Sequence, residues 1–107
     1  MVNEGFRNTL ETIKNMIYEH GLNNYINVDY FIKNAVYAAI EEGEKSDIVI
    51  NPKTNEVRKV FRKTMTVIAI TKDGLVLNIT LVKTRDGYEV DYLNIDSIHR
   101  SECICSE

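Results

Sequence analysis

The stretch from Thr64 to Thr84 constrains the fold most, because it predicts two long β-strands joined by a tight turn. Its second half carries an apolar side chain at every second position: Leu75, Leu77, Ile79 and Leu81. In a strand, this alternation places all four side chains on one face of the sheet. The turn contains Asp73-Gly74, whose glycine tolerates the positive φ of a short hairpin. We therefore expect an antiparallel hairpin with one apolar face at the centre of the fold.

A first helix is predicted over residues 3–20. Apolar residues recur there at spacings of three and four: Val2, Phe6, Leu10, Ile13 and Ile17. This stripe is typical of an amphipathic helix. Asn3 is suited to cap the start of the helix, and Gly21 is suited to end it. We expect the stripe to pack on the protein's own sheet, with a dimer seam as the alternative.

A second helix is predicted over residues 28–42, with Asn27 as its cap and Gly43 just past its end. Its residues are apolar almost all round, which is typical of a helix held between two layers. One layer would be the sheet, and the other would be either the first helix or a second subunit. Acidic residues would lie at the negative end of the helix dipole: Glu41, Glu42 and Glu44. We interpret them as a solvated acidic loop.

Four strands are expected after the helices. A short strand at 47–50 and a turn at 51–55 precede the segment 56–63, which runs into the central hairpin. Neither face of 56–63 is cleanly apolar, so we expect an exposed or edge strand guarded by charge. A second Asp-Gly turn precedes a last strand at 88–93.

The sequence therefore predicts an α+β fold, in which two N-terminal helices pack on one face of a four-stranded antiparallel meander sheet. We expect one domain over residues 1–100 and a flexible C-terminal tail over residues 101–107.

Composition narrows the function classes. The chain of 107 residues and 12.3 kDa has a net charge of −3 and a pI near 5.4, which argues against a surface that grips nucleic acid as a whole. No apolar run reaches the length of a membrane span, and the N-terminus lacks an apolar signal segment. The two cysteines, Cys103 and Cys105, both lie in the tail, which is typical of a protein of the reducing cytoplasm.

The sequence shows no established catalytic motif. It lacks a glycine-rich phosphate loop, a nucleophile elbow and a His-Glu-x-x-His pair, so we expect neither catalytic residues nor a cofactor. His99 with the two tail cysteines is the best metal candidate, but a C-terminal tail is a poor cage, and we expect no metal. His20, at a predicted helix end, is interpreted as a dipole partner rather than a general base.

The strongest local anomaly is the basic segment 48–63. It has five basic residues against one acidic residue, for a charge of +4, while the rest of the chain sums to −7. A basic ribbon in an acidic protein can attract an anionic ligand, although edge protection by lysine and arginine gives the same pattern. The candidate ligand-binding residues are Lys53, Arg58, Lys59, Arg62, Lys63, His99 and Arg100.

A second candidate surface is the sheet face opposite the helices, which is unusually apolar for a face in water. We expect this face to form an interface through Val76, Asn78, Thr80 and Val82. Two tyrosines of the predicted second helix, Tyr30 and Tyr37, are expected to join it. A homodimer or higher homo-oligomer is the expected assembly. A protein target or an anionic small molecule is a further expected partner, nucleic acid is not favoured, and no membrane contact is expected.

The order of helices, basic strand and meander ending in His99-Arg100 faintly resembles the small RelE-like and BrnT-like ribonuclease toxins. That resemblance implies RNA cleavage with His99, Arg100 and the basic strand. Our first hypothesis is instead a small non-enzymatic binding module of a bacterium or phage, either an inhibitor, an immunity-type or a regulatory protein. The alternatives are the ribonuclease toxin and a nucleotide-binding sponge or sensor that uses residues 58–63.

Overall fold

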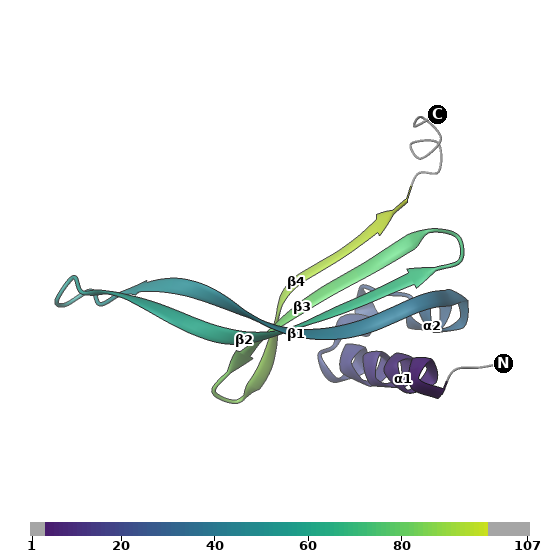
Figure 1. The fold of residues 1–107 in the computed structure, drawn as a ribbon, viewed down its shortest axis with the longest axis horizontal. Helices are drawn as coiled ribbons and strands as arrows, with labels where there is room; N and C mark the ends of the chain where they lie inside the picture. The colour runs from purple at the N-terminus through teal and green to yellow at the C-terminus, as the bar shows by residue number, and fades with distance from the viewer. Residues whose placement is uncertain (1–3, 99–107) are drawn as a thin grey trace.

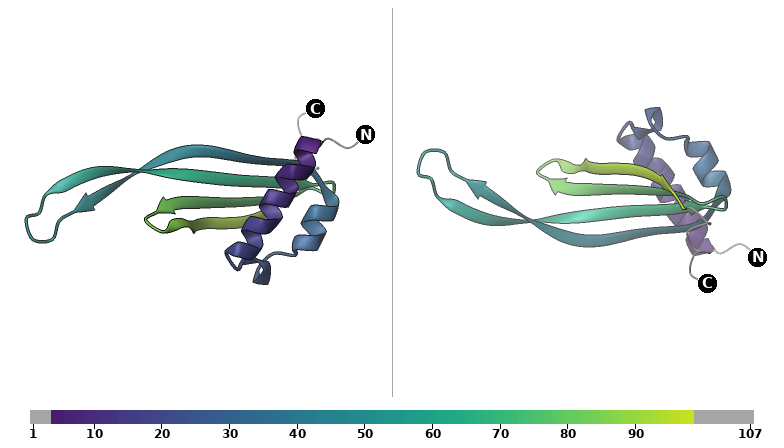
Figure 2. Two further views of the ribbon diagram at one scale, coloured as in Figure 1. Left: turned by 90° about the horizontal axis from the view of Figure 1, so that it is seen from below. Right: turned by 90° about the horizontal axis from the view of Figure 1, so that it is seen from above.

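The computed structural model describes residues 4–98, which form two helices and a four-stranded sheet (Figure 1). The helical elements are α1 (Glu4–Glu19), the short 3₁₀ turn η1 (Leu22–Asn24) and α2 (Val28–Asn34). The strands are β1 (Ala35–Ile50), β2 (Val57–Thr71), β3 (Leu75–Thr84) and β4 (Gly87–Ser97). All neighbours are antiparallel, in the order β1-β2-β3-β4. The predicted α+β meander is therefore confirmed, and Figure 2 shows both helices on one face of the sheet.

The core lies between the helices and the central hairpin. The predicted apolar row of β3 is buried at Leu77, Ile79 and Leu81, and α1 buries Ile13 and Ile17 against it. Fully burying one such side chain is worth about 1.5–3 kcal/mol relative to leaving it exposed. The stripe of the first helix therefore packs on the protein's own sheet, as expected.

The predicted second helix is wrong in its second half. α2 ends at Asn34, and the residues assigned to its continuation, 35–42, form the first part of β1. Asn27 does cap α2, because its side-chain oxygen accepts a hydrogen bond from the Tyr30 amide at 3.2 Å. The first strand accordingly begins at Ala35 rather than at Asp47, and the glutamates at 41, 42 and 44 lie in a strand rather than at a helix end.

Hydrogen bonds fasten α2 to the turn between β2 and β3. The Tyr30 hydroxyl and the Thr71 hydroxyl both donate to the Asp73 carboxylate, and the Leu75 amide donates to the Thr71 hydroxyl at 3.0 Å. The bonds from Thr71 and Tyr30 lower the pKa of Asp73, and the bond to Asp73 raises the pKa of Tyr30. The short helix is thus held by the hairpin turn as well as by the core.

The last strand is longer than predicted. β4 runs from Gly87 to Ser97 rather than ending near Leu93, and a bulge at Asp91 absorbs the change in its apolar pattern. No described helix of residues 4–98 is long and apolar enough to cross a membrane. The predicted C-terminal tail and its two cysteines lie outside the described residues.

Candidate binding surface

One hairpin of the sheet extends well beyond the rest. β1 pairs with β2 from Ile50↔Val57 to Ala35↔Thr71, whereas β3 pairs with β2 only over 64–70. Residues 44–63, which we call the arm, therefore form a ribbon of two strands with no third neighbour (Figures 1 and 2). The Cα radius of gyration is 17.4 Å, against about 13 Å for a compact chain of this length.

The tip of the arm is an ordered turn. The Asn51 amide donates to the Glu56 carbonyl at 2.8 Å, and the Asn55 amide donates to the Asn51 carbonyl at 2.7 Å. Asn51 also accepts a hydrogen bond from the Lys53 amide through its side chain, and Asn55 adopts φ 61°, a value that asparagine tolerates better than most residues. The turn predicted at 51–55 is therefore confirmed.

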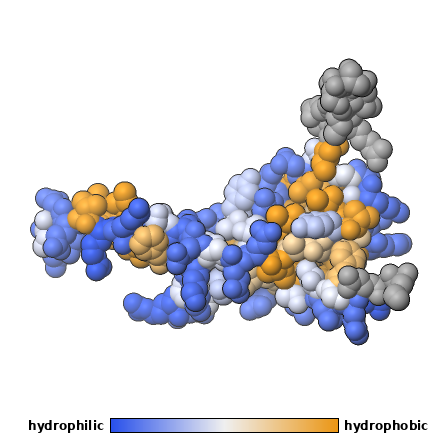
Figure 3. Space-filling model, in the orientation of Figure 1, coloured by the Kyte–Doolittle hydropathy of each residue, from blue (hydrophilic) through white to orange (hydrophobic). Residues whose placement is uncertain are grey.

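One face of the arm is apolar and open to solvent. The register Ile50↔Val57 and Ser46↔Phe61, with the alternation of a strand, puts four large apolar side chains on this face. Their exposed fractions are 70% for Ile48, 59% for Ile50, 63% for Val57 and 61% for Phe61. Figure 3 shows this apolar group on the arm, apart from that on the body of the molecule. Four neighbouring exposed apolar residues form a patch typical of a contact surface.

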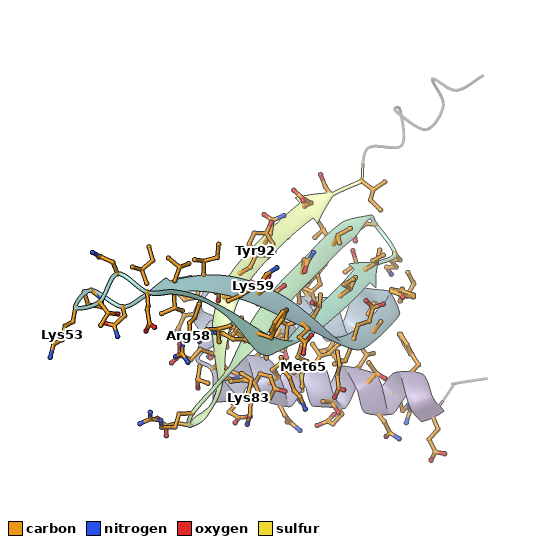
Figure 4. The ribbon with its side chains drawn as sticks, turned by 60° about the vertical axis from the view of Figure 1, so that its left-hand side comes forward. Lys53, Arg58, Lys59, Met65, Lys83 and Tyr92 are labelled. Carbon is orange, nitrogen blue, oxygen red and sulfur yellow. The ribbon has the colours of Figure 1, made fainter. Side chains whose placement is uncertain are left out.

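The arm also gathers the predicted cationic residues. Lys53 lies at its tip and Arg58 and Lys59 lie along it (Figure 4). Lys59 Nζ lies 5.9 Å from the centre of the Phe61 ring, so a cation borders the apolar face. Of the five arm cations predicted as ligand-binding residues, only Arg62 lies within 4.0 Å of a carboxylate among residues 4–98, with its Nε 3.4 Å from Asp47. The arm as a whole has six basic and three acidic residues, for a charge of +3.

The base of the arm is tied to the far strand of the sheet. Lys45 Nζ lies 3.3 Å from an Asp91 carboxylate oxygen of β4 and 4.0 Å from Asp47. These side chains are 37% to 44% exposed, so each pair contributes at most about 1 kcal/mol. The contact links the base of the arm to β4.

The sheet face opposite the helices, here called the open face, carries most of the predicted interface residues. Its central side chains follow from the strand register: Tyr37, Ile68, Ile70, Val76, Asn78, Thr80, Val82 and Tyr92. Of these, Val82 is already buried within the single chain, at 7% exposed. Tyr37 belongs to it as a residue of β1, not of a helix as predicted. Tyr30 does not belong to it, because its hydroxyl is bound to Asp73 at the β2–β3 turn. His99 and Arg100 lie outside the described residues.

At least three hollows among the described residues have the size of small ligand sites, and the first, of about 520 Å³, lies beside α2 with Asp29 and Lys33 in its wall. The second, of about 460 Å³ at the arm tip, is lined by Pro52, Lys53 and Arg58 among others. The third, of about 410 Å³, lies where the end of α1 meets the β3–β4 turn, with His20 and Asp86 in its wall. Sequence reasoning missed the third hollow, because nothing in the chain order shows that these residues meet. Within residues 4–98, no three His, Cys, Asp or Glu side chains are grouped to hold a metal ion.

The chain matches no protein-family model, and neither curated proteins nor solved structures give a significant match.

Proposed function

We propose that this chain is a non-enzymatic binding module that acts through protein–protein contacts, with the arm as its docking element. The observation that carries the proposal is the exposure of Ile48, Ile50, Val57 and Phe61 on a ribbon that no other part of residues 4–98 covers. A specific interface buries about 800 Å² per partner, centred on a few apolar or arginine anchors. Phe61 is the arm's best candidate for such an anchor, with Lys59 beside it on the same face.

The mixture of side chains favours a protein partner over nucleic acid. Proteins bind phosphate backbones mainly through lysine and arginine, and the overall charge of −3 weakens such binding by electrostatic repulsion. The arm face that carries Phe61 instead places Lys59 and Lys63 beside an apolar group, which is the arrangement of an interface with an apolar centre and a polar rim. A partner surface that is apolar at its centre and acidic at its border complements the arm.

Capture of a partner with matched variants tests the proposal. Wild-type chain, Phe61→Ser on the arm and Tyr25→Ser as a control are immobilised and exposed to extract of the native host. Tyr25 is also aromatic and is 74% exposed, but it lies on the linker before α2. We expect a partner that binds the wild type and the control and is lost with Phe61→Ser. Equal capture by all three would contradict a role for the arm.

An anionic small molecule such as a nucleotide is a second candidate partner, because Lys53 and Arg58 line the same hollow at the arm tip. A nucleotide at 100 times its dissociation constant stabilises a protein by about 2.7 kcal/mol, which a thermal shift detects. The shift is expected to disappear in Arg58→Ala. Absence of any shift across a nucleotide panel would remove this candidate.

The ribonuclease alternative rests on His99 and Arg100 and has its own test. RNA cleavage by the wild type that is lost in His99→Ala would replace the binding-module proposal with an enzyme.

A further inference from the structure

We propose that the arm's partner is a second copy of this chain, and that two copies exchange arms, each laying its arm on the open face of the other. The inference rests on the proposed function, because it names the partner of the arm. It depends on three features of the described residues: the charges of the two surfaces, the composition of the open face and the lengths of the strands.

The charges favour the arm on the open face and oppose the arm on another arm. The four rows of side chains across the open face contain Glu41, Glu89 and Asp96 and no lysine or arginine. That face therefore carries −3, whereas the arm face with Phe61 carries +1, from Lys59 and Lys63 against Glu44. Two arms placed together would bring like charges into contact, which costs affinity, whereas arm and open face attract each other.

The open face has the composition of a covered surface. An antiparallel sheet with one wet face normally alternates apolar and polar residues, but here Ile68, Ile70, Val76 and Val82 all face away from the helices. Among them, the Asn78 side-chain oxygen is buried and has no hydrogen-bond partner within residues 4–98. The open face is therefore more apolar than a sheet face in water normally is.

The two surfaces also match in length. The arm comprises seven strand pairs, from Glu44↔Lys63 to Ile50↔Val57. The body of the sheet has seven pairs between β2 and β3, from Thr64↔Val82 to Ile70↔Val76. At about 3.3 Å per residue, each is about 23 Å long, so one arm spans one open face.

Each chain carries one arm and one open face, so a reciprocal exchange covers the arm and the open face of both copies. Such an arrangement is isologous and closes in a two-fold symmetric dimer.

Light scattering coupled to size-exclusion chromatography, over concentrations up to about 1 mM, tests the inference with three variants. Phe61→Glu places an acid on the arm, Tyr92→Lys places a base on the open face, and Tyr25→Lys is the control on the linker. The changed side chains are 61%, 51% and 74% exposed, so their loss leaves the core intact. A circular dichroism melt checks the fold of each, and Ile48→Ser replaces Phe61→Glu if that variant unfolds.

We expect twice the 12.3 kDa chain mass for the wild type and the control. Phe61→Glu and Tyr92→Lys are each expected to raise the dissociation constant at least about 30-fold, the size of a hot-spot loss. An equal mixture of the two is expected to restore a dimer, because the intact arm of one variant still meets the intact open face of the other. An arm-to-arm contact predicts the opposite, namely a dimeric Tyr92→Lys and no recovery on mixing.

Besides that outcome, three results would overturn the inference. They are a wild type that stays monomeric throughout, a dimer that survives Phe61→Glu, and a larger assembly in place of the closed dimer. A monomeric wild type leaves the proposed function standing, because the arm-dependent capture of a different protein from the host extract is measured separately.

Discussion

Strand β1 passes without a break through two environments. In the body of the protein, Ala38 and Ile40 pack against the core, and β2 beside them is flanked by β3. In the arm, Ile48 and Ile50 belong to the same strand and pair with the same partner, yet they are more than half exposed. The comparison teaches that strand pairing needs no core, whereas burial needs a second layer, which the helices supply to the body. It also separates roles: the body holds the fold, and the arm is available for contact.

The sharpest test of that separation substitutes the same residue type in both regions. Ile79→Ala removes a side chain that is fully buried in the body, and we expect a loss of about 2–5 kcal/mol in the free energy of unfolding. Ile48→Ala removes one that is 70% exposed on the arm, and we expect a change within about 0.5 kcal/mol. Urea unfolding of dilute protein measures both. Similar losses would mean that the arm is packed in the folded chain.

The next largest loss of stability is expected when the hydrogen bond between α2 and the hairpin turn is removed. Tyr30→Phe removes the hydroxyl that donates to Asp73, and we expect a loss of stability smaller than that of Ile79→Ala. Tyr25→Phe on the exposed linker is the matched control and should leave stability unchanged. A Tyr30→Phe protein as stable as the wild type would show that this hydrogen bond does not fasten the helix.

The same hydrogen bond gives a pH dependence with a definite sign. The bond from Thr71, and after it the bond from Tyr30, lower the pKa of Asp73 from 3.8 in the folded protein, so the contribution of these bonds is full above pH 3.8 and is lost as the pH falls through the lowered value. The pKa of Tyr30 is raised from 10.0, so its contribution is full below pH 10.0 and is lost as the pH rises through the raised value. The stability difference between wild type and Tyr30→Phe should therefore be widest between these limits and narrow in both acid and alkali.

The smallest effect is expected at the base of the arm. Asp91→Asn removes the charge that faces Lys45, and since both side chains are partly exposed, the free energy of unfolding should change by less than about 1 kcal/mol. The change should fade further in high salt, because screening weakens exposed ion pairs. A larger loss would show that the body and the arm are coupled rather than separate.

Much of the body could be predicted from the sequence, because alternation and turn residues act locally. The Leu75–Leu81 row, both Asp-Gly turns and the Asn27 cap needed only neighbouring residues to be recognised. The residues 35–42 were misassigned because a stretch that is apolar all round fits a buried strand as well as a buried helix. Val36, Tyr37 and Ile40 favour a strand, and glutamates at a helix end disfavour a helix, so the signal was present.

The arm itself was only partly predictable. Its charge and exposure were expected from residues 56–63. How far the arm extends beyond the sheet depends on where β3 stops pairing with β2, which residues 56–63 do not show. β2 has 15 residues and β3 has 10, and the same turn joins them, so β2 extends beyond the end of β3. The open face was expected to be apolar, but its lack of any base depends on the strand register, which only the fold supplies.

Amide hydrogen exchange along β1, in protein dilute enough to be monomeric, tests the contrast between body and arm most directly. The amides of residues 38–42 and 45–49 lie in one strand against one partner, so they differ in the core and in the third strand that support only the first group. Among the amides that bond to β2, we expect those of 45–49 to exchange at least about tenfold faster than those of 38–42, because local opening of the ribbon disrupts no core packing. Equal protection along the whole strand would contradict the account, since it would show that the arm is not an open ribbon in the single chain.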